Sequence, residues 1–166
     1  MLSGETAIGE YPRETVDVMA RIARVTEEGY RPADAWTAGD HSDPELHGIT
    51  SAVAHTAGRL AECLEAKMII VASRSGATAR AISNNRNFVP TVGVSNSEAT
   101  LRRMCLYWGV TPLSGCPTED SGDILEYAVE RAREIGYVAE RDCVVLIAGT
   151  GLRVSRHNMI VVHEIE

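Results

Sequence analysis

Residues 68–80 have the sequence MIIVASRSGATAR, and this stretch predicts the fold around it. Residues 68–72 form an apolar run without polar alternation, which is typical of a strand buried on both faces of a parallel sheet. A short turn rich in serine, glycine and threonine follows, and a helix-compatible run begins at Ala77. Strand, turn and helix in this order predict one βα unit.

The turn after this strand carries the candidate binding residues. Backbone N–H groups and the helix dipole converge at such a turn, and hydroxyls with an arginine are well suited to hold a phosphate. The candidates are Ser73, Arg74, Ser75, Gly76, Ala77 and Thr78. The same hydroxyls are equally suited to cap the helix. The spacing alone leaves both interpretations open.

The rest of the chain repeats the strand and helix pattern. A capping box of Ser95 and Glu98 predicts the start of one helix. No helix-length segment separates the last two apolar runs, so we expect those strands to be antiparallel neighbours. The pattern predicts an α/β fold, a three-layer α/β/α sandwich whose five-stranded sheet is mostly parallel with an antiparallel last strand. The other expected strands are 91–94, 110–113, 143–148 and 159–162, and the other expected helices are 49–66, 95–104 and 121–135.

Composition excludes several classes of protein. The 166 residues are 45% hydrophobic and carry a net charge of −7, which argues against nucleic-acid binding because a phosphate backbone demands a basic surface. No apolar run approaches the ~20 residues of a membrane span, and no signal peptide is evident, so we expect a cytoplasmic protein without a membrane partner. The four cysteines, spaced too widely for a metal site, are expected to be reduced thiols, mostly in or near the core: Cys63, Cys105, Cys116 and Cys143.

Motifs for catalysis are missing. Gly149-Thr150-Gly151 lacks the third glycine of a dinucleotide site, the 73–78 turn lacks the Gly-Lys-Ser/Thr ending of a phosphate-binding P-loop, and the histidines show no metal spacing. The best remaining polar cluster is Arg153, Arg156 and His157, which suits an anion contact, a plain loop or, less well, a general base. The residues therefore predict a binding or regulatory domain without metal or catalytic machinery of its own.

Several longer segments resemble one family in the right order. KMIIVASRSGATAR (67–80), LYWGVTPL (106–113) and GYVAERDCVVLIAG (136–149) are similar to successive segments of the C-terminal part of pyruvate kinase. MLSGETAIGEYPRETVDVM (1–19) resembles the segment that closes the family's catalytic barrel. Together these matches cover nearly the whole chain.

The resemblance implies a division of the chain. Residues 1–28 would be a remnant of the last barrel unit, with a helix from about Pro12 to Gly29. Residues 29–48 would connect it to a regulatory α/β domain at 49–166. The family's substrate-binding residues and the ligands of its Mg and K ions belong to the barrel upstream. The chain by itself is therefore expected to be inactive, although it resembles part of a phosphotransferase.

The resemblance also implies partners. In effector-regulated relatives the 73–78 turn holds the phosphate of a sugar phosphate, typically fructose 1,6-bisphosphate, and the family is generally tetrameric. The last loop here is shorter than usual and has His157 in place of a threonine, so the effector stays open between sugar phosphates and nucleotides. Two alternatives remain: a free-standing protein that binds phospho-metabolites, and an assembly module with a vestigial turn. The last strand, 159–163, is expected to be an edge suited to self-association.

Overall fold

The computed structural model describes residues 1–29, 48–117, 120–148 and 159–166. The chain divides into two compact units, Met1–Ala38 and Gly39–Glu166, and each is described by itself. Residues 30–47, most of the expected connector, lie outside the described residues, so its role stays a prediction. None of the described helices is both long and apolar enough to cross a membrane.

The first unit contains two helices, α1 (Gly4–Ala7) and α2 (Pro12–Gly29). In α1 the N–H of Ala7 donates to the carbonyl of Ser3 over 3.0 Å and closes a helical turn. Helix α2 begins and ends as expected, with a proline at the first position where its missing N–H is harmless. None of its residues is buried.

The second unit is the α/β sandwich that the sequence predicts. Its sheet has the strand order β3-β2-β1-β4-β5, and β5 alone is antiparallel to its neighbour. The strands are β1 (Met68–Ala72), β2 (Thr91–Val94), β3 (Val110–Leu113), β4 (Cys143–Ala148) and β5 (Met159–Glu164). The helices are α3 (Gly48–Cys63), α4 (Ala77–Asn85), α5 (Glu98–Met104) and α6 (Ser121–Glu134).

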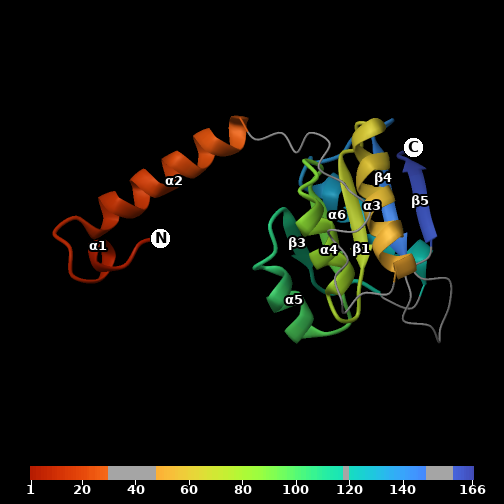
Figure 1. The fold of residues 1–166 in the computed structure, drawn as a ribbon. Helices are drawn as coiled ribbons and strands as arrows, with labels where there is room; N and C mark the ends of the chain where they lie inside the picture. Colours follow the sequence, from red (N-terminus) through yellow and green to blue (C-terminus); the bar gives the residue numbers. More distant parts are fainter. Residues whose placement is uncertain (30–47, 118–119, 149–158) are drawn as a thin grey trace. The chain divides into compact units, whose positions relative to one another are not determined.

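Two apolar cores flank the sheet because alternate side chains of its central strands point to opposite faces. Ile69 and Val71 of β1 pack with α3, α4 and Met104 of α5. Met68 and Ile70 pack with α6 on the other face. Figure 1 shows α3 and α4 in front of the sheet and α6 behind it. The unbroken apolar run at 68–72 is thus explained by burial on both sides.

Two local expectations differ from the structure. Helix α3 ends at Cys63 rather than near residue 66, because Glu65 adopts a left-handed conformation with a φ of 51° and the N–H of Ala66 turns back to the carbonyl of Ala61. The predicted capping box of Ser95 and Glu98 is wrong. Ser97 is the N-cap of α5, and its hydroxyl accepts the N–H of Thr100 over 3.3 Å.

Candidate functional site: the 73–78 turn at the carboxyl edge of the sheet

The 73–78 turn lies at the point where the winding of the sheet reverses. From β1 the chain passes to β2 and β3 on one side, and then returns to β4 on the other side. In open α/β sheets, ligands bind beyond the carboxyl ends of the strands at such a switch point. Ala72 is the last residue of β1, so the turn occupies this position directly.

The three hydroxyl-bearing residues of the turn differ in burial. The side chain of Ser73 is buried and accepts the N–H of Gly76 over 3.1 Å. Ser75 is exposed, and its hydroxyl accepts the N–H of Ala77 over 3.3 Å. Thr78 is also buried. Ser75 therefore presents the most accessible of the three candidate hydroxyls.

Two backbone N–H groups of the turn have no acceptor among the described residues. They belong to Arg74 and Ser75, which are both exposed. Helix α4 has no side-chain cap on its Gly76 N-cap and no acidic residue in its first turn. Successive N–H groups beside the positive end of a helix dipole form a concavity that favours an anion.

Gly76 is required by the shape of the turn. Its φ of 83° is a left-handed conformation that other residues adopt only with strain. A Cβ atom at this position would lie 3.2 Å from Cγ2 of Thr100 and 3.5 Å from the hydroxyl of Tyr107. The glycine thus lets the turn lie directly against α5 and the residues that follow it.

Helix α5 holds the carbonyls of the turn, a feature that the sequence analysis missed. Thr100 Oγ1 donates to the carbonyl of Arg74 over 2.9 Å, and Ser95 Oγ approaches the same carbonyl at 3.4 Å. Arg103 Nη2 donates to the carbonyl of Ser75 over 3.3 Å and to Thr100 Oγ1 over 3.1 Å. The available signal was topological: β2 and β1 are parallel neighbours, so the turns that follow them must lie side by side.

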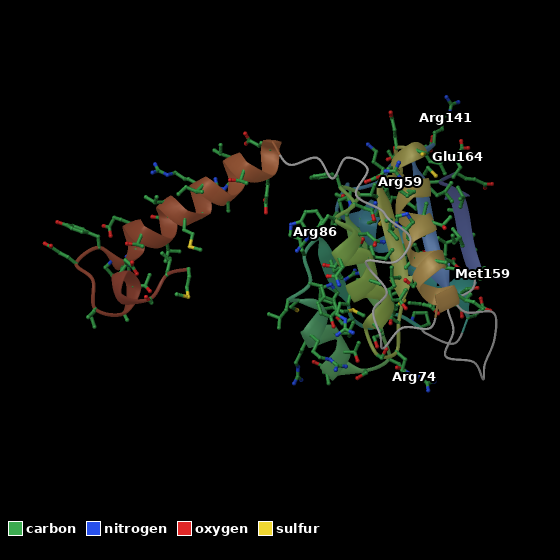
Figure 2. All side chains as sticks on the ribbon, viewed as in Figure 1. Arg59, Arg74, Arg86, Arg141, Met159 and Glu164 are labelled. Atoms are coloured by element: carbon green, nitrogen blue, oxygen red, sulfur yellow. The ribbon has the colours of Figure 1, made fainter. Side chains whose placement is uncertain are left out.

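Arginines give the turn a local positive charge in a chain whose net charge is −7. Arg74 is exposed, and Figure 2 shows its side chain extending away from the end of the sheet at which β1 ends. Figure 2 places Arg141 and Glu164 at the opposite end. Arg103 adds a second guanidinium beside the turn. An anion at the turn would therefore meet cationic side chains from two elements.

Most of the second unit matches one known family. The model of the family described as "Pyruvate kinase, alpha/beta domain" matches residues 51–163. The chain belongs to the pyruvate kinase family. Its sequence is 35% identical over 167 residues to a pyruvate kinase of Clostridium acetobutylicum, covering 100% of this chain and 35% of that protein. It is 37% identical over 150 residues to one of Sporosarcina psychrophila, covering 90% of this chain and 25% of that protein.

Solved structures agree on the fold. A crystal structure of a pyruvate kinase from Cryptosporidium parvum superposes with a TM-score of 0.76 at 24% identity, covering 100% of this chain and 32% of that one. The chain therefore spans between a quarter and about a third of the length of these relatives. The expected family and fold class are both confirmed, and the chain is the C-terminal portion of the pyruvate kinase architecture.

Three further candidate residues of this pyruvate kinase domain belong to the segment between β4 and β5. Arg153, Arg156 and His157 lie outside the described residues, so their meeting with the turn stays a prediction. The strands on either side, β4 and β5, bring Ala148 and Met159 opposite each other. Ala148 ends a strand parallel to β1, at the same edge as the turn. The strand ends that flank residues 149–158 therefore lie at the edge of the sheet that carries the turn.

Two of the four cysteines, Cys116 and Cys143, have thiols with a raised pKa. Contrary to expectation, Cys63 and Cys105 are exposed, while Cys116 and Cys143 are half-buried; all four are free thiols. Burial raises the pKa of Cys116 to about 11. Burial and the nearby carboxylate of Glu164 raise the pKa of Cys143. A raised pKa keeps a thiol protonated near neutral pH, where only the thiolate is a strong nucleophile.

Proposed function

We propose that this chain is the regulatory and assembly portion of a pyruvate kinase, and that its 73–78 turn binds the phosphate of a phosphorylated effector. The observation that carries the proposal is that the N–H groups of Arg74 and Ser75, two exposed residues, have no acceptor among the described residues at the start of a helix whose N-cap is a glycine. A phosphate supplies the acceptor oxygens that these donors lack and the negative charge that the helix dipole favours.

The effector would be a sugar phosphate or a nucleotide. One phosphate would occupy the turn, with Ser75 and Arg74 contributing a hydroxyl and a charge. Arg153, Arg156 and His157 are the proposed contacts for the rest of the molecule, because their loop joins strand ends at the same edge of the sheet. The side chains of Ser73 and Thr78 would act from beneath the turn, since both are buried.

An isothermal titration with fructose 1,6-bisphosphate, ribose 5-phosphate, glucose 6-phosphate and AMP tests this proposal. We expect saturable binding of at least one of them. Ser75→Ala should weaken it about three- to tenfold, as for a net loss of ~1 kcal/mol from one hydrogen bond. The matched control is Ser97→Ala, which removes a serine hydroxyl from the neighbouring turn, where it caps α5. That variant should bind the ligand as well as the parent chain.

Two results would count against the effector site. If none of the four ligands binds, assembly would be left as the role of this domain, and the 73–78 turn would serve only to start α4. Equal loss of affinity in Ser75→Ala and Ser97→Ala would place binding outside the 73–78 turn. Thr78→Ala extends the series to the buried hydroxyl at the helix start.

Phosphoryl transfer from phosphoenolpyruvate to ADP is assigned to the part of a longer pyruvate kinase that this chain does not span. The Mg and K ions expected for the family are proposed to bind in that same part; among the described residues there is no cluster of three or more His, Cys, Asp or Glu side chains able to hold a metal. The exposed apolar side chains of α2, which include Val16, Met19 and Ile22, are proposed to pack against that missing part. A coupled assay should detect no pyruvate formation by this chain alone, and measurable turnover would overturn the assignment.

Self-association through β5 is the assembly half of the proposal. Strand β5 is an edge of the sheet formed by the described residues, and Val162 on it is 47% exposed. An apolar edge strand is a template for pairing with a second copy. Val162→Lys should lower the mass found by sedimentation, whereas Thr111→Lys on the opposite edge strand should leave it unchanged. A parent chain that sediments as a monomer at all concentrations would remove this half of the proposal.

A further inference from the structure

Side chains of helix α5 contact the 73–78 turn at backbone carbonyl groups of the turn rather than at the side chains of the turn. Thr100 Oγ1 donates to the carbonyl of Arg74, and Arg103 Nη2 donates to the carbonyl of Ser75. The same Arg103 nitrogen also reaches Thr100 Oγ1 at 3.1 Å, so the two α5 residues form one connected group. The side chain of Thr100 is 1% exposed, so its hydroxyl is fixed in the packed interior.

These contacts fix the directions of two peptide planes. In a trans peptide, the carbonyl and the following N–H point in opposite directions. Because the carbonyl of Arg74 points toward α5, the N–H of Ser75 points away from it. Because the carbonyl of Ser75 points toward Arg103, the N–H of Gly76 points the other way, and it donates to Ser73 Oγ. Thr100 and Arg103 thereby determine where the N–H groups of Ser75 and Gly76 are aimed.

We propose that Thr100 and Arg103 are positioning residues that set the affinity of the 73–78 turn for phosphate by holding its carbonyls against α5. The inference rests on the proposed phosphate site and adds the element that regulates it. When the donors are already held in place before binding, less conformational entropy of the turn is lost on binding, and the affinity for phosphate is higher. A turn released from α5 would have the same N–H groups and hydroxyls, but would have to order them on binding.

The chain supplies a matched control for this idea. Arg102 and Arg103 are adjacent on α5, are both exposed, and differ in what they contact. Arg102 forms an i,i+4 ion pair with Glu98 at 3.1 Å, whereas Arg103 contacts the turn. Each alanine variant removes one positive charge from the same short helix. A difference between them therefore reports on the contact with the turn rather than on the net charge.

The first readout is amide hydrogen exchange in the ligand-free chain. Arg103→Ala should accelerate exchange of the Gly76 and Ala77 amides several-fold, while Arg102→Ala leaves it unchanged. Thr100→Val should act like Arg103→Ala, and Thr100→Ser, which keeps the hydroxyl, should restore protection. Unchanged exchange in both Arg103→Ala and Thr100→Val would overturn the inference, whether or not the chain binds phosphate.

The second readout is the affinity for inorganic phosphate, which is measured by titrating the full chain with phosphate. Arg103→Ala should weaken binding about three- to tenfold, as for the loss of one hydrogen bond, and Arg103→Lys, which keeps donors on one nitrogen, should recover most of it. The loss should persist at high salt, because a purely electrostatic effect fades as the screening length falls from about 10 Å at 0.1 M to about 3 Å at 1 M.

The outcomes separate this inference from the proposed function. A parent chain that binds neither phosphate nor any phosphorylated effector would overturn both. Faster exchange in Arg103→Ala with unchanged phosphate affinity would overturn the positioning role and leave the phosphate site standing. Equal losses of affinity in Arg102→Ala and Arg103→Ala, both abolished by salt, would show that charge alone matters and would also overturn the positioning role.

Discussion

The 73–78 turn and the neighbouring turn at residues 95–97 follow parallel strands, lie side by side and differ in how their helices begin. The second turn is an ordinary helix start: Ser97 has an extended φ of −110°, its hydroxyl accepts the N–H of Thr100, and Glu98 follows in the first turn. The first turn places Gly76, with a φ of 83°, at the N-cap and has neither a side-chain cap nor an acidic residue in the first turn.

This difference shows what separates a helix start from an anion site. A carboxylate in the first turn of a helix interacts favourably with the dipole and satisfies part of what an external anion would supply. Glu98 provides that charge within α5, whereas Ala77 occupies the equivalent first position of α4. The two turns have similar sequences, SRSGAT and SNSEAT. The two helices start one residue apart in these sequences, so at the N-cap the first turn has glycine where the second has serine, and at the first helical position it has alanine where the second has glutamate.

The largest expected effect comes from Gly76→Ala, which forces a side chain into the feature that distinguishes the first turn. We expect a loss of ~2 kcal/mol in the free energy of unfolding, because the left-handed conformation costs about 1–2 kcal/mol and the new Cβ would lie 3.2 Å from Thr100 Cγ2. Thermal unfolding and phosphate titration measure the two consequences, and phosphate binding should disappear.

Gly109→Ala is the control for this variant. Gly109 has a φ of 69°, but a Cβ there would meet no atom within 4 Å. Its stability should fall by the conformational cost alone, and phosphate binding should be unaffected. If Gly76→Ala unfolds at the temperature of the parent chain and still binds phosphate, the left-handed glycine does not define the site.

The second variant, Ala77→Glu, makes the first turn resemble the second. The new carboxylate would occupy the position that Glu98 holds in α5, so it should compete with phosphate for the helix start. We expect affinity to fall about tenfold or more, a change of ~1.4 kcal/mol, with stability unchanged or slightly raised. Ala77→Gln controls for size without charge. Equal phosphate affinity in the two variants would contradict an anion site at this helix start.

The sequence predicted the central βα unit well because its signals are local. The apolar run 68–72 predicts a strand, and the turn-forming residues Ser73 and Gly76 predict the turn that precedes the helix. Neither prediction needs tertiary information. The same local signals failed at α5, where Ser95 and Ser97 both precede Glu98 at distances compatible with capping. The structure assigns the cap to Ser97 because Ser95 Oγ accepts the N–H of Ser97 and donates to the carbonyl of Arg74.

The role of α5 in the candidate site could not come from local patterns. Thr100 and Arg103 are separated from Arg74 and Ser75 by more than twenty residues, and they meet only because β1 and β2 pair in parallel.

Ser97→Ala in the second turn should change stability without changing phosphate affinity. Losing a serine N-cap costs about 1 kcal/mol, so this variant should lower the free energy of unfolding in denaturant by about that amount. Its phosphate affinity should be that of the parent chain, because its hydroxyl is already used by Thr100. Ser75→Ala should show the converse pattern, with little change in stability and weaker binding. If the two variants change stability and phosphate affinity to the same extent, the two turns do not differ in function as proposed.

The smallest expected effect belongs to Glu98→Gln, which makes the second turn resemble the first only in charge. Removing the carboxylate abolishes the exposed ion pair with Arg102 and the favourable interaction with the helix dipole. Each is worth about 0.3–0.5 kcal/mol at a solvated site. Denaturant unfolding at low salt should therefore show a loss below ~1 kcal/mol that shrinks as salt is added.

Glu98→Gln should not create a second phosphate site at residues 95–97. Ser97 still accepts the N–H of Thr100, and Ser95 Oγ accepts the N–H of Ser97, so these two donors stay occupied when the charge is gone. The first turn differs because the N–H of Ser75, which corresponds to Ser97 when SRSGAT and SNSEAT are aligned, lacks an acceptor among the described residues. A Glu98→Gln chain that binds a second phosphate would show that removing one carboxylate is sufficient, and that the left-handed glycine and the exposed donors are not what makes the 73–78 turn a binding site.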